Sequence, residues 1–203
     1  MSKPRSPFGP PERLPEVRLR AASTLADVGD LVADALESRR GEHPQVAGLV
    51  PALVMANRAG FVTTGWQAGG GAPVEVDGWI WTQLAAVTGL CSESTTRSLC
   101  DHLDGGTGVL PNTIAPPDSR RSRPGGPFAR GIWATWCENP DTREKRTPML
   151  FGEPASRRSL RSMFGEAAAG AWQCTFFAAG WDRNDRLWPF LTAWAEAAAP
   201  ARR

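Results

Sequence analysis

Proline and glycine interrupt this sequence along its whole length, and no other feature constrains its folding as strongly. The 203 residues include 18 Pro and 21 Gly. Proline breaks the interior of a helix or a central strand, and glycine favours turns and helix ends. Their spread predicts many short helices and strands rather than a bundle of long helices. The sequence contains no internal repeat.

Five segments carry apolar residues at helical spacing, and each of them predicts a short helix. These segments are 23–36, 46–58, 92–104, 156–167 and 187–198. Ser23, Ser92 and Ser156 precede three of the apolar patterns, and serine is a preferred N-cap. Pro51 fits a helix best in its first turn, so the second helix is expected to begin near Leu49.

Short runs of β-branched and aromatic residues predict the strands. The runs are 61–66, 74–87, 109–115, 131–137, 148–151 and 174–178. The second and longest run is expected to bend or break around Asp77 and Gly78, because this pair is typical of a turn.

The irregular alternation of helices and strands predicts an α/β or α+β fold with a mixed sheet flanked by helices. Residues 21–198 are expected to form a single globular domain. A disordered or surface arm at 1–20 would precede this domain, and a tail at 199–203 would follow it. Apolar residues on the predicted helix faces, including Leu31 and Met163, are expected in the core.

The cysteine and histidine content argues against several classes of site. Four cysteines form no C-x-x-C pair, and only two histidines accompany them. No zinc-ligand spacing follows, and we expect neither a metal nor another cofactor. The N-terminal sequence lacks an apolar secretory segment, and no run approaches the roughly 18 apolar residues of a membrane span. These features predict a cytoplasmic protein with reduced thiols and no membrane partner.

The charge is distributed unevenly, although the formal net charge is only +2. Residues 120–161 contain ten basic and four acidic residues, so this segment carries a net charge of +6. Such a segment is typical of a surface that faces anions, and equally of a solvated loop. It leaves open an alternative function as a nucleic-acid or protein interaction module that uses this basic face, with Trp133 or Trp136 as stacking surfaces.

The segment NRAGFVTTGWQAGGG, residues 57–71, is the best-formed motif in the chain. Thr63, Trp66 and Gln67 lie on its predicted strand, and Gln83 would lie on a neighbouring strand. Two facing carboxamides can bind a planar polar group, and glycines allow a ligand to approach closely. The alternative is a helix end, a strand and a turn in which the glutamines bind backbone groups. The motif has neither the lysine of a P-loop nor the glycine spacing of a dinucleotide-binding loop.

This motif resembles a family of uncharacterised actinobacterial proteins. Their pattern is Asn-Arg-Ala-Gly-Phe-x-Thr-x-x-Ser-Gln-x-Gly, followed downstream by Gln-Arg-Ala-x-Val-x-Gly. The matching positions of this chain are Asn57, Arg58, Gly60, Phe61, Thr63, Gln67, Gly69, Gln83, Ala85, Val87 and Gly89. Segments 24–31 and 183–191 are also similar. Trp66 replaces the serine of the pattern and Leu84 replaces the second arginine, and the resemblance implies no activity, because none is assigned to the family.

Arg157 and Arg158 follow Ser156 in the first turn of a predicted helix, where arginine opposes the helix dipole. A bound anion would reverse this penalty, whereas a later helix start would remove it. We therefore expect a domain that binds a polar, anionic or nucleotide-like small molecule. Thr63, Gln67 and Gln83 would orient this molecule, and the two arginines would bind its negative end. Whether the domain is also an enzyme stays open, and catalysis would use no metal.

Two further polar clusters are expected to be structural. The alternating charges of residues 182–186 predict a local cluster of ion pairs and caps. Cys100 and His102 lie two positions apart on a predicted helix, so their side chains diverge and form no thiol–imidazole dyad.

Overall fold

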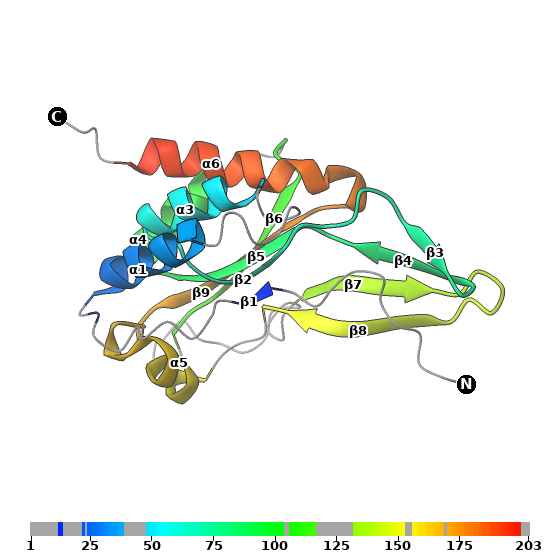
Figure 1. The fold of residues 1–203 in the computed structure, drawn as a ribbon, viewed down its shortest axis with the longest axis horizontal. Helices are drawn as coiled ribbons and strands as arrows, with labels where there is room; N and C mark the ends of the chain where they lie inside the picture. Colours follow the sequence, from blue (N-terminus) through cyan, green and yellow to red (C-terminus); the bar gives the residue numbers. More distant parts are fainter. Residues whose placement is uncertain are drawn as a thin grey trace.

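The computed structural model describes residues 12–13, 22, 24–38, 48–103, 106–116, 132–152, 156–168 and 170–199. Within these ranges nine strands form two sheets, and five α-helices accompany them (Figure 1). Every described strand pair is antiparallel.

The central sheet has five strands in the order β1-β2-β5-β9-β6. These strands are β1 (Glu12–Arg13), β2 (Val62–Gln67), β5 (Ala86–Cys91), β9 (Trp172–Ala178) and β6 (Val109–Ile114). The last strand in the sequence, β9, lies between β5 and β6. The middle of the sheet therefore joins segments from both halves of the chain.

The second sheet, which we call the arm sheet, extends to one side of the helices (Figure 1). Its order is β3-β4-β7-β8, with β3 (Val74–Val76), β4 (Trp79–Gln83), β7 (Ile132–Glu138) and β8 (Lys145–Phe151). Asp77 and Gly78 join β3 to β4, and their φ values of 51° and 74° fit the type I′ turn of a two-residue hairpin.

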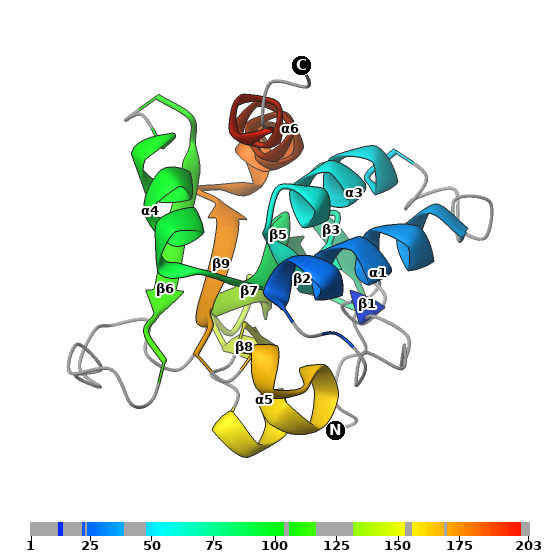
Figure 2. The same cartoon turned by 90° about the vertical axis from the view of Figure 1, so that its left-hand side faces the viewer.

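The helices cover the two faces of the central sheet unequally. They are α1 (Leu25–Ser38), α3 (Val50–Arg58), α4 (Glu93–Asp101), α5 (Arg157–Phe164) and α6 (Leu187–Ala198). Two 3₁₀ turns, η2 (Glu166–Ala168) and η3 (Trp181–Arg186), precede β9 and α6. Figure 2 shows α1, α3, α4 and α6 on one side of the sheet and α5 on the other.

The predicted combination of helices and sheet in one domain is confirmed, but the expected mixed sheet is wrong. Parallel neighbours need long crossover connections, whereas short turns join the hairpins β3–β4 and β7–β8. The predicted strand at 74–87 comprises more than one strand. The chain turns at Asp77–Gly78 and bends again at Leu84–Ala85, and β5 then continues to Cys91. Within the arm predicted at 1–20, β1 pairs with β2, and the rest of it lies outside the described residues.

Local sequence signals place most helix starts correctly. Ser92 and Ser156 cap α4 and α5 as predicted, because each hydroxyl accepts a bond from the backbone N–H three residues later. Pro51 lies in the first turn of α3, which confirms the later start of this helix. Thr24 caps α1 through a bond from the N–H three residues later. Ser23, the predicted cap, lies outside the described residues.

The main core lies between the central sheet and its covering helices. Its fully buried large side chains include Trp194, Phe61, Phe176, Leu36, Leu53, Leu90, Leu99, Leu187 and Leu191. The predictions that Leu31 and Met163 face the core are wrong, because these side chains are 38% and 49% exposed. On α1 the side facing α3 instead carries small residues. A Cβ added to Gly29 would lie 2.5 Å from the backbone oxygen of Asn57, so glycine permits this close packing.

Candidate functional site

Thr63, the first predicted site residue, is bonded to the end of the preceding helix. Asn57 Nδ2 donates to Thr63 Oγ1 at 2.8 Å, and Thr63 N donates to Asn57 Oδ1 at 2.9 Å. Asn57 Nδ2 also donates to Leu53 O at 2.7 Å. Thr63 is fully buried and Asn57 is 1% exposed, so the pair closes the connection between α3 and β2.

The other residues of the NRAGF segment also have contacts that explain them. Arg58 Nη2 lies 3.0 Å from Glu37 Oε2, which joins the end of α3 to α1. Gly60 has a φ of 97°, a conformation that glycine adopts at helix ends without strain. The ring of Phe61 fills the space beside Gly89, where an added Cβ would lie 2.7 Å from Phe61 Cζ. The residues that carry the resemblance thus specify packing at the α3–β2 connection.

A β-bulge separates two residues that were expected to act together. Thr63 pairs with Gly89, whereas Gln67 pairs with Ala86, because the register of β2 shifts between Thr63 and Gly65. Paired residues share a face of the sheet, and positions three apart on β5 lie on opposite faces. Thr63 and Gln67 therefore point to opposite faces of the central sheet and do not converge on one ligand.

Gln67 and Gln83 lie at the junction between the central sheet and the arm sheet. Gln67 Nε2 donates to Leu84 O at 2.7 Å and to Ala134 O at 3.2 Å. Gln83 Nε2 donates to Thr135 Oγ1 at 3.3 Å. Both carboxamides are buried and use their N–H groups within the fold. That they bind a ligand stays a prediction.

Asn184 of η3 fixes the same junction from the other end of the chain. Its Oδ1 accepts a bond from Ala85 N at 2.6 Å, and its Nδ2 donates to Gly70 O and, at 2.9 Å, to Gln83 O. A Cβ added to Gly69 would lie 2.6 Å from both Ala85 N and Asn184 Cγ. The sequence segments around 69, 83 and 184, all of which carry the resemblance, thus meet in space. Of the local cluster expected in residues 182–186, an ion pair joins Arg186 and Asp185 at 3.9 Å, and no side chain of the described residues caps η3 or α6.

Trp66 is a core residue of the helix-covered side of the sheet. Its side chain is 3% exposed and belongs to the main core. Its Nε1 is buried and has no hydrogen-bond partner in the described part of the chain, as is also the case for Trp81 Nε1. The Trp66 ring therefore packs in the core at the position where the related pattern has serine. Because the ring is almost fully buried, it offers little surface to a ligand.

The predicted anion site at the start of α5 is only partly visible. Arg158 is exposed in the first turn of α5, and the side chain of Arg157 lies outside the described residues. On the basic 120–161 face, carboxylates accompany several described cations: Lys145 with Glu138, Arg146 with Glu144, and Arg161 with Glu166. Residues 117–131, which hold four arginines of this face, also lie outside the description.

The polar side of α4 forms a groove that the sequence predictions missed. The groove is shallow and largely open to solvent, and it has a volume of about 410 Å³. Its lining residues are Ser94, Arg97, Ser98, Asp101 and His102. The first four follow the i, i+3, i+4, i+7 spacing of one helix face, and the opposite face buries Thr96 and Leu99. This polar stripe is readable in the sequence, but a solvated helix face has the same pattern.

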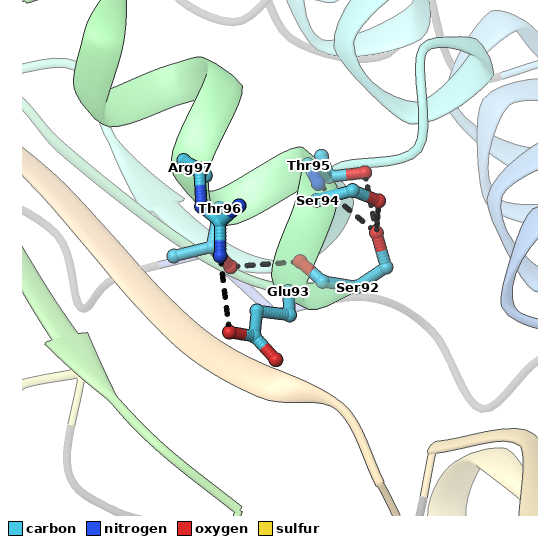
Figure 3. Close-up of polar contacts among 6 residues, drawn as sticks. All are labelled: Ser92, Glu93, Ser94, Thr95, Thr96 and Arg97. Carbon is cyan, nitrogen blue, oxygen red and sulfur yellow. Dashed lines mark hydrogen bonds and ion pairs between the residues drawn. The ribbon is translucent and has the colours of Figure 1, made fainter. Parts of the chain in front are cut away.

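Local contacts hold the first turn of α4 in place (Figure 3). The Ser92 hydroxyl accepts a bond from Thr95 N at 3.0 Å and contacts Ser94 Oγ at 2.8 Å. Glu93 Oε1 lies 3.3 Å from Arg97 Nη2, an ion pair between positions i and i+4 (Figure 3). The guanidinium of Arg97 is thereby drawn toward the N-terminal end of the groove.

Helix α6 fixes the other end of the groove. Trp194 Nε1 donates to Ser98 Oγ at 3.2 Å, and the rings of His102 and Phe190 lie 5.8 Å apart. Figure 2 shows α4 and α6 on the same side of the central sheet. The groove thus combines two hydroxyls, a guanidinium, a carboxylate and an imidazole on a helix held by a second helix.

Three thiols lie in or near α4: Cys100 belongs to the helix, and Cys91 and Cys174 are buried. Burial raises the pKa of Cys91 well above its ordinary value, and the neighbouring Cys174 thiol adds to this effect. Thr96 Oγ1 lies 3.4 Å from Cys174 Sγ. Burial also raises the pKa of the half-buried Cys100, and the charges of Cys174 and Asp101 raise it further. These environments favour neutral thiols at Cys91 and Cys100. At Cys174 the hydrogen bond with Cys91 lowers the pKa, although burial opposes this effect.

The described residues hold neither a cluster of metal-ligating side chains nor a membrane-spanning helix. No three histidine, cysteine, aspartate or glutamate side chains within them gather as metal ligands. None of the described helices has the length and apolar character to cross a membrane.

One family of known proteins is similar to this chain over about half of its length. A family model described as a domain of unknown function (DUF6919) matches residues 16–122. The matched residues run through α1, the motif at 57–71 and the groove residues of α4 to β6 and beyond. They end before β7, so β9 and Asn184 lie outside the match. No curated protein matches the chain.

Proposed function

The chain belongs to this family of domains of unknown function, DUF6919, and we propose that it binds a small polar molecule in the α4 groove. The observation that carries this proposal is the groove of about 410 Å³, which polar side chains of one helix face line. Small-molecule sites commonly have volumes of about 300–1,000 Å³. The lining offers donors, acceptors and both signs of charge, so its ligand is polar.

Arg97 supports an anionic group on this ligand. A guanidinium has five N–H donors in a fork that matches a carboxylate or a phosphate, and Glu93 occupies only one edge of it. The side chain of Arg97 is 68% exposed, so its partner remains in contact with water. We therefore expect modest affinity and a marked dependence on salt.

This proposal keeps the class of ligand that the sequence predicts but moves the site. Buried hydrogen bonds and packing account for Thr63, Trp66, Gln67 and Gln83. A role of these residues and of Arg157 and Arg158 in ligand binding remains a second location to test. We also propose that the family is actinobacterial, that it carries the Asn-Arg-Ala-Gly-Phe motif and that the chain acts in the cytoplasm.

The basic 120–161 face supports a second candidate function, binding of nucleic acid or of an acidic protein. Arg143 and Arg158 have no carboxylate partner among the described residues, and both are exposed. Binding of this kind should weaken steeply between about 50 and 200 mM salt. The absence of a shift with either DNA or RNA at 50 mM salt would remove the nucleic-acid form of this candidate.

A thermal-shift and NMR screen tests the main proposal. Amino acids, sugar phosphates, nucleotides and inorganic phosphate are added at low salt, and hits are mapped by chemical-shift changes. We expect a hit that moves α4 resonances and that Arg97→Gln weakens. Arg158→Gln is the matched control and should leave the hit unchanged. A hit that depends on Arg158 and not on Arg97 would move the site to α5, and a screen with no hit at α4 would overturn the proposal.

A further inference from the structure

Two opposite charges stand one helical turn apart on the wall of the groove. Arg97 and Asp101 occupy positions i and i+4 of α4, and both line the groove. Cβ atoms at this spacing are about 6 Å apart. We propose that the ligand is a zwitterion that carries an acidic group and an amine, as an amino acid does. This inference rests on the proposed function and names its ligand class.

The two charges do not neutralise each other. Arg97 forms its ion pair with Glu93, on the preceding turn, and Asp101 forms no ion pair within the described residues. A cation followed by an acid at i+4 is the less favourable order for a helical pair. Arg97 is therefore drawn toward one end of the groove, and the carboxylate of Asp101 remains available at the other end.

The position of Asp101 on the helix favours a bound cation. It is the last residue of α4, and this helix has no basic residue in its last turn. A carboxylate at a helix C-terminus lies at the negative end of the helix dipole. An ammonium group bound between Asp101 and the last carbonyls would interact favourably with both. The hydroxyls of Ser94 and Ser98 lie on the same face and can bind the polar atoms between the two charged ends.

The experiment uses amino acids of increasing length, so that the distance between the carboxylate and the amine varies along the series. Glycine, β-alanine, 4-aminobutyrate and 6-aminohexanoate are titrated into the full chain, and α4 amide shifts give the dissociation constants. Butyrate and butylamine serve as probes that carry only one of the charges. We expect at least one of the amino acids to bind more tightly than both butyrate and butylamine. The gain should be at most about fivefold, because an exposed ion pair contributes no more than about that factor.

Charge variants separate the two ends. Asp101→Asn should reduce the affinity for the amino acid to that for butyrate, and Arg97→Gln should reduce it to that for butylamine. Glu93→Gln releases Arg97 and should tighten butyrate binding. All three side chains are exposed, so the melting temperature should change little and checks that each variant is folded.

The outcomes distinguish the inference from the proposed function. If butyrate binds as tightly as every amino acid and Asp101→Asn changes nothing, the zwitterion is wrong while the groove remains a binding site. If butylamine binds as tightly as the amino acids and butyrate does not, the ligand needs no acidic group, and that part of the inference is wrong. If none of these probes and no compound of the wider screen moves α4 resonances, the proposed function fails, and the inference fails with it.

Discussion

Asn57 and Thr63 bind each other through two buried hydrogen bonds, one between side chains at 2.8 Å and one from Thr63 N at 2.9 Å. The pair joins the last turn of α3 to the first residues of β2. Asn57 also bonds its own helix at Leu53 O. A motif residue that looked available to a ligand thus completes a connection in the fold.

Thr63→Val tests this role. The substitution keeps the shape of the side chain but removes the acceptor for Asn57 Nδ2, so we expect a loss of about 1–2 kcal/mol of unfolding free energy. Urea denaturation measures it. Thr113→Val on the exposed side of β6 is the control and should stay within about 0.5 kcal/mol. Equal effects of the two substitutions would contradict the structural role of Thr63.

Asn184 should be among the most sensitive polar residues of the chain. Asn184→Ala removes three hydrogen bonds at the junction of the sheets, so we expect a loss of about 2–4 kcal/mol. Asn184→Asp keeps the acceptor for Ala85 N but places a carboxylate against two carbonyls, and it should be as harmful. Asp185→Asn next to it should cost little. Denaturant unfolding of the three variants measures this, and a mild Asn184→Asp would show that the carbonyl contacts matter little.

The three consecutive glycines that end the motif are not equivalent. Gly69 has a φ of 85°, and an added Cβ would lie 2.6 Å from Ala85 N, whereas a Cβ on Gly71 meets nothing within 4 Å. We expect Gly69→Ala to destabilise the fold by about 2 kcal/mol or more. Gly71→Ala should be neutral. Thermal unfolding of both variants provides the measurement, and a neutral Gly69→Ala would mean that the loop moves freely.

Two buried tryptophans allow a comparison of an indole N–H that has a hydrogen-bond partner with one that has none. Trp66 Nε1 has no partner in the described chain, whereas Trp194 Nε1 donates to Ser98. Replacement by phenylalanine removes similar volume at both sites but breaks a hydrogen bond only at Trp194. We expect Trp194→Phe to cost about 1 kcal/mol more than Trp66→Phe in unfolding free energy. The reverse order would indicate that Trp66 Nε1 is satisfied in solution.

Alkylation of Cys100 should report on its surroundings. Burial first, and then the charges of Cys174 and Asp101, raise the pKa of this thiol from its ordinary value of 9.0. A raised pKa leaves less thiolate at a given pH, so the iodoacetamide rate should reach half its maximum above pH 9.0. Asp101→Asn removes one negative charge and should lower this midpoint. Peptide mapping by mass spectrometry follows the site, and an unchanged midpoint would show that Asp101 does not act on the thiol.

The sequence predicts local structure well where one residue determines it. Ser92, Ser156 and Pro51 mark helix starts because capping and proline geometry depend on neighbouring residues alone. Two predicted site residues, Thr63 and Gln67, do not converge on one site, because their relation depends on how β2 pairs with β5. Thr63 and Gln67 are four positions apart, so in a regular strand they would point to the same face of the sheet. A single extra residue in β2 places them on opposite faces. Gly65 inside the predicted strand is the one local signal that is typical of a bulge, but it does not specify the shift in register.

Other features depend on partners that are distant along the chain. The exposure of Leu31 follows from the close approach of α3 to Gly29, and helical spacing alone cannot specify which side another helix will approach. The groove on α4 becomes distinct from an ordinary solvated helix face only when α6 contacts Ser98 and His102. The antiparallel order of the sheet likewise requires knowledge of where β9 inserts.

The central position of β9 sets the size of the cooperative folding unit. Strands β5 and β6 each pair with β9, and they do not pair with each other. A fragment ending at residue 122, where the family match ends, would leave both strands with unpaired backbone edges and prone to aggregate. The part of the chain that the family model matches therefore ends inside this paired unit, and a shortened chain should be unable to reach the native state.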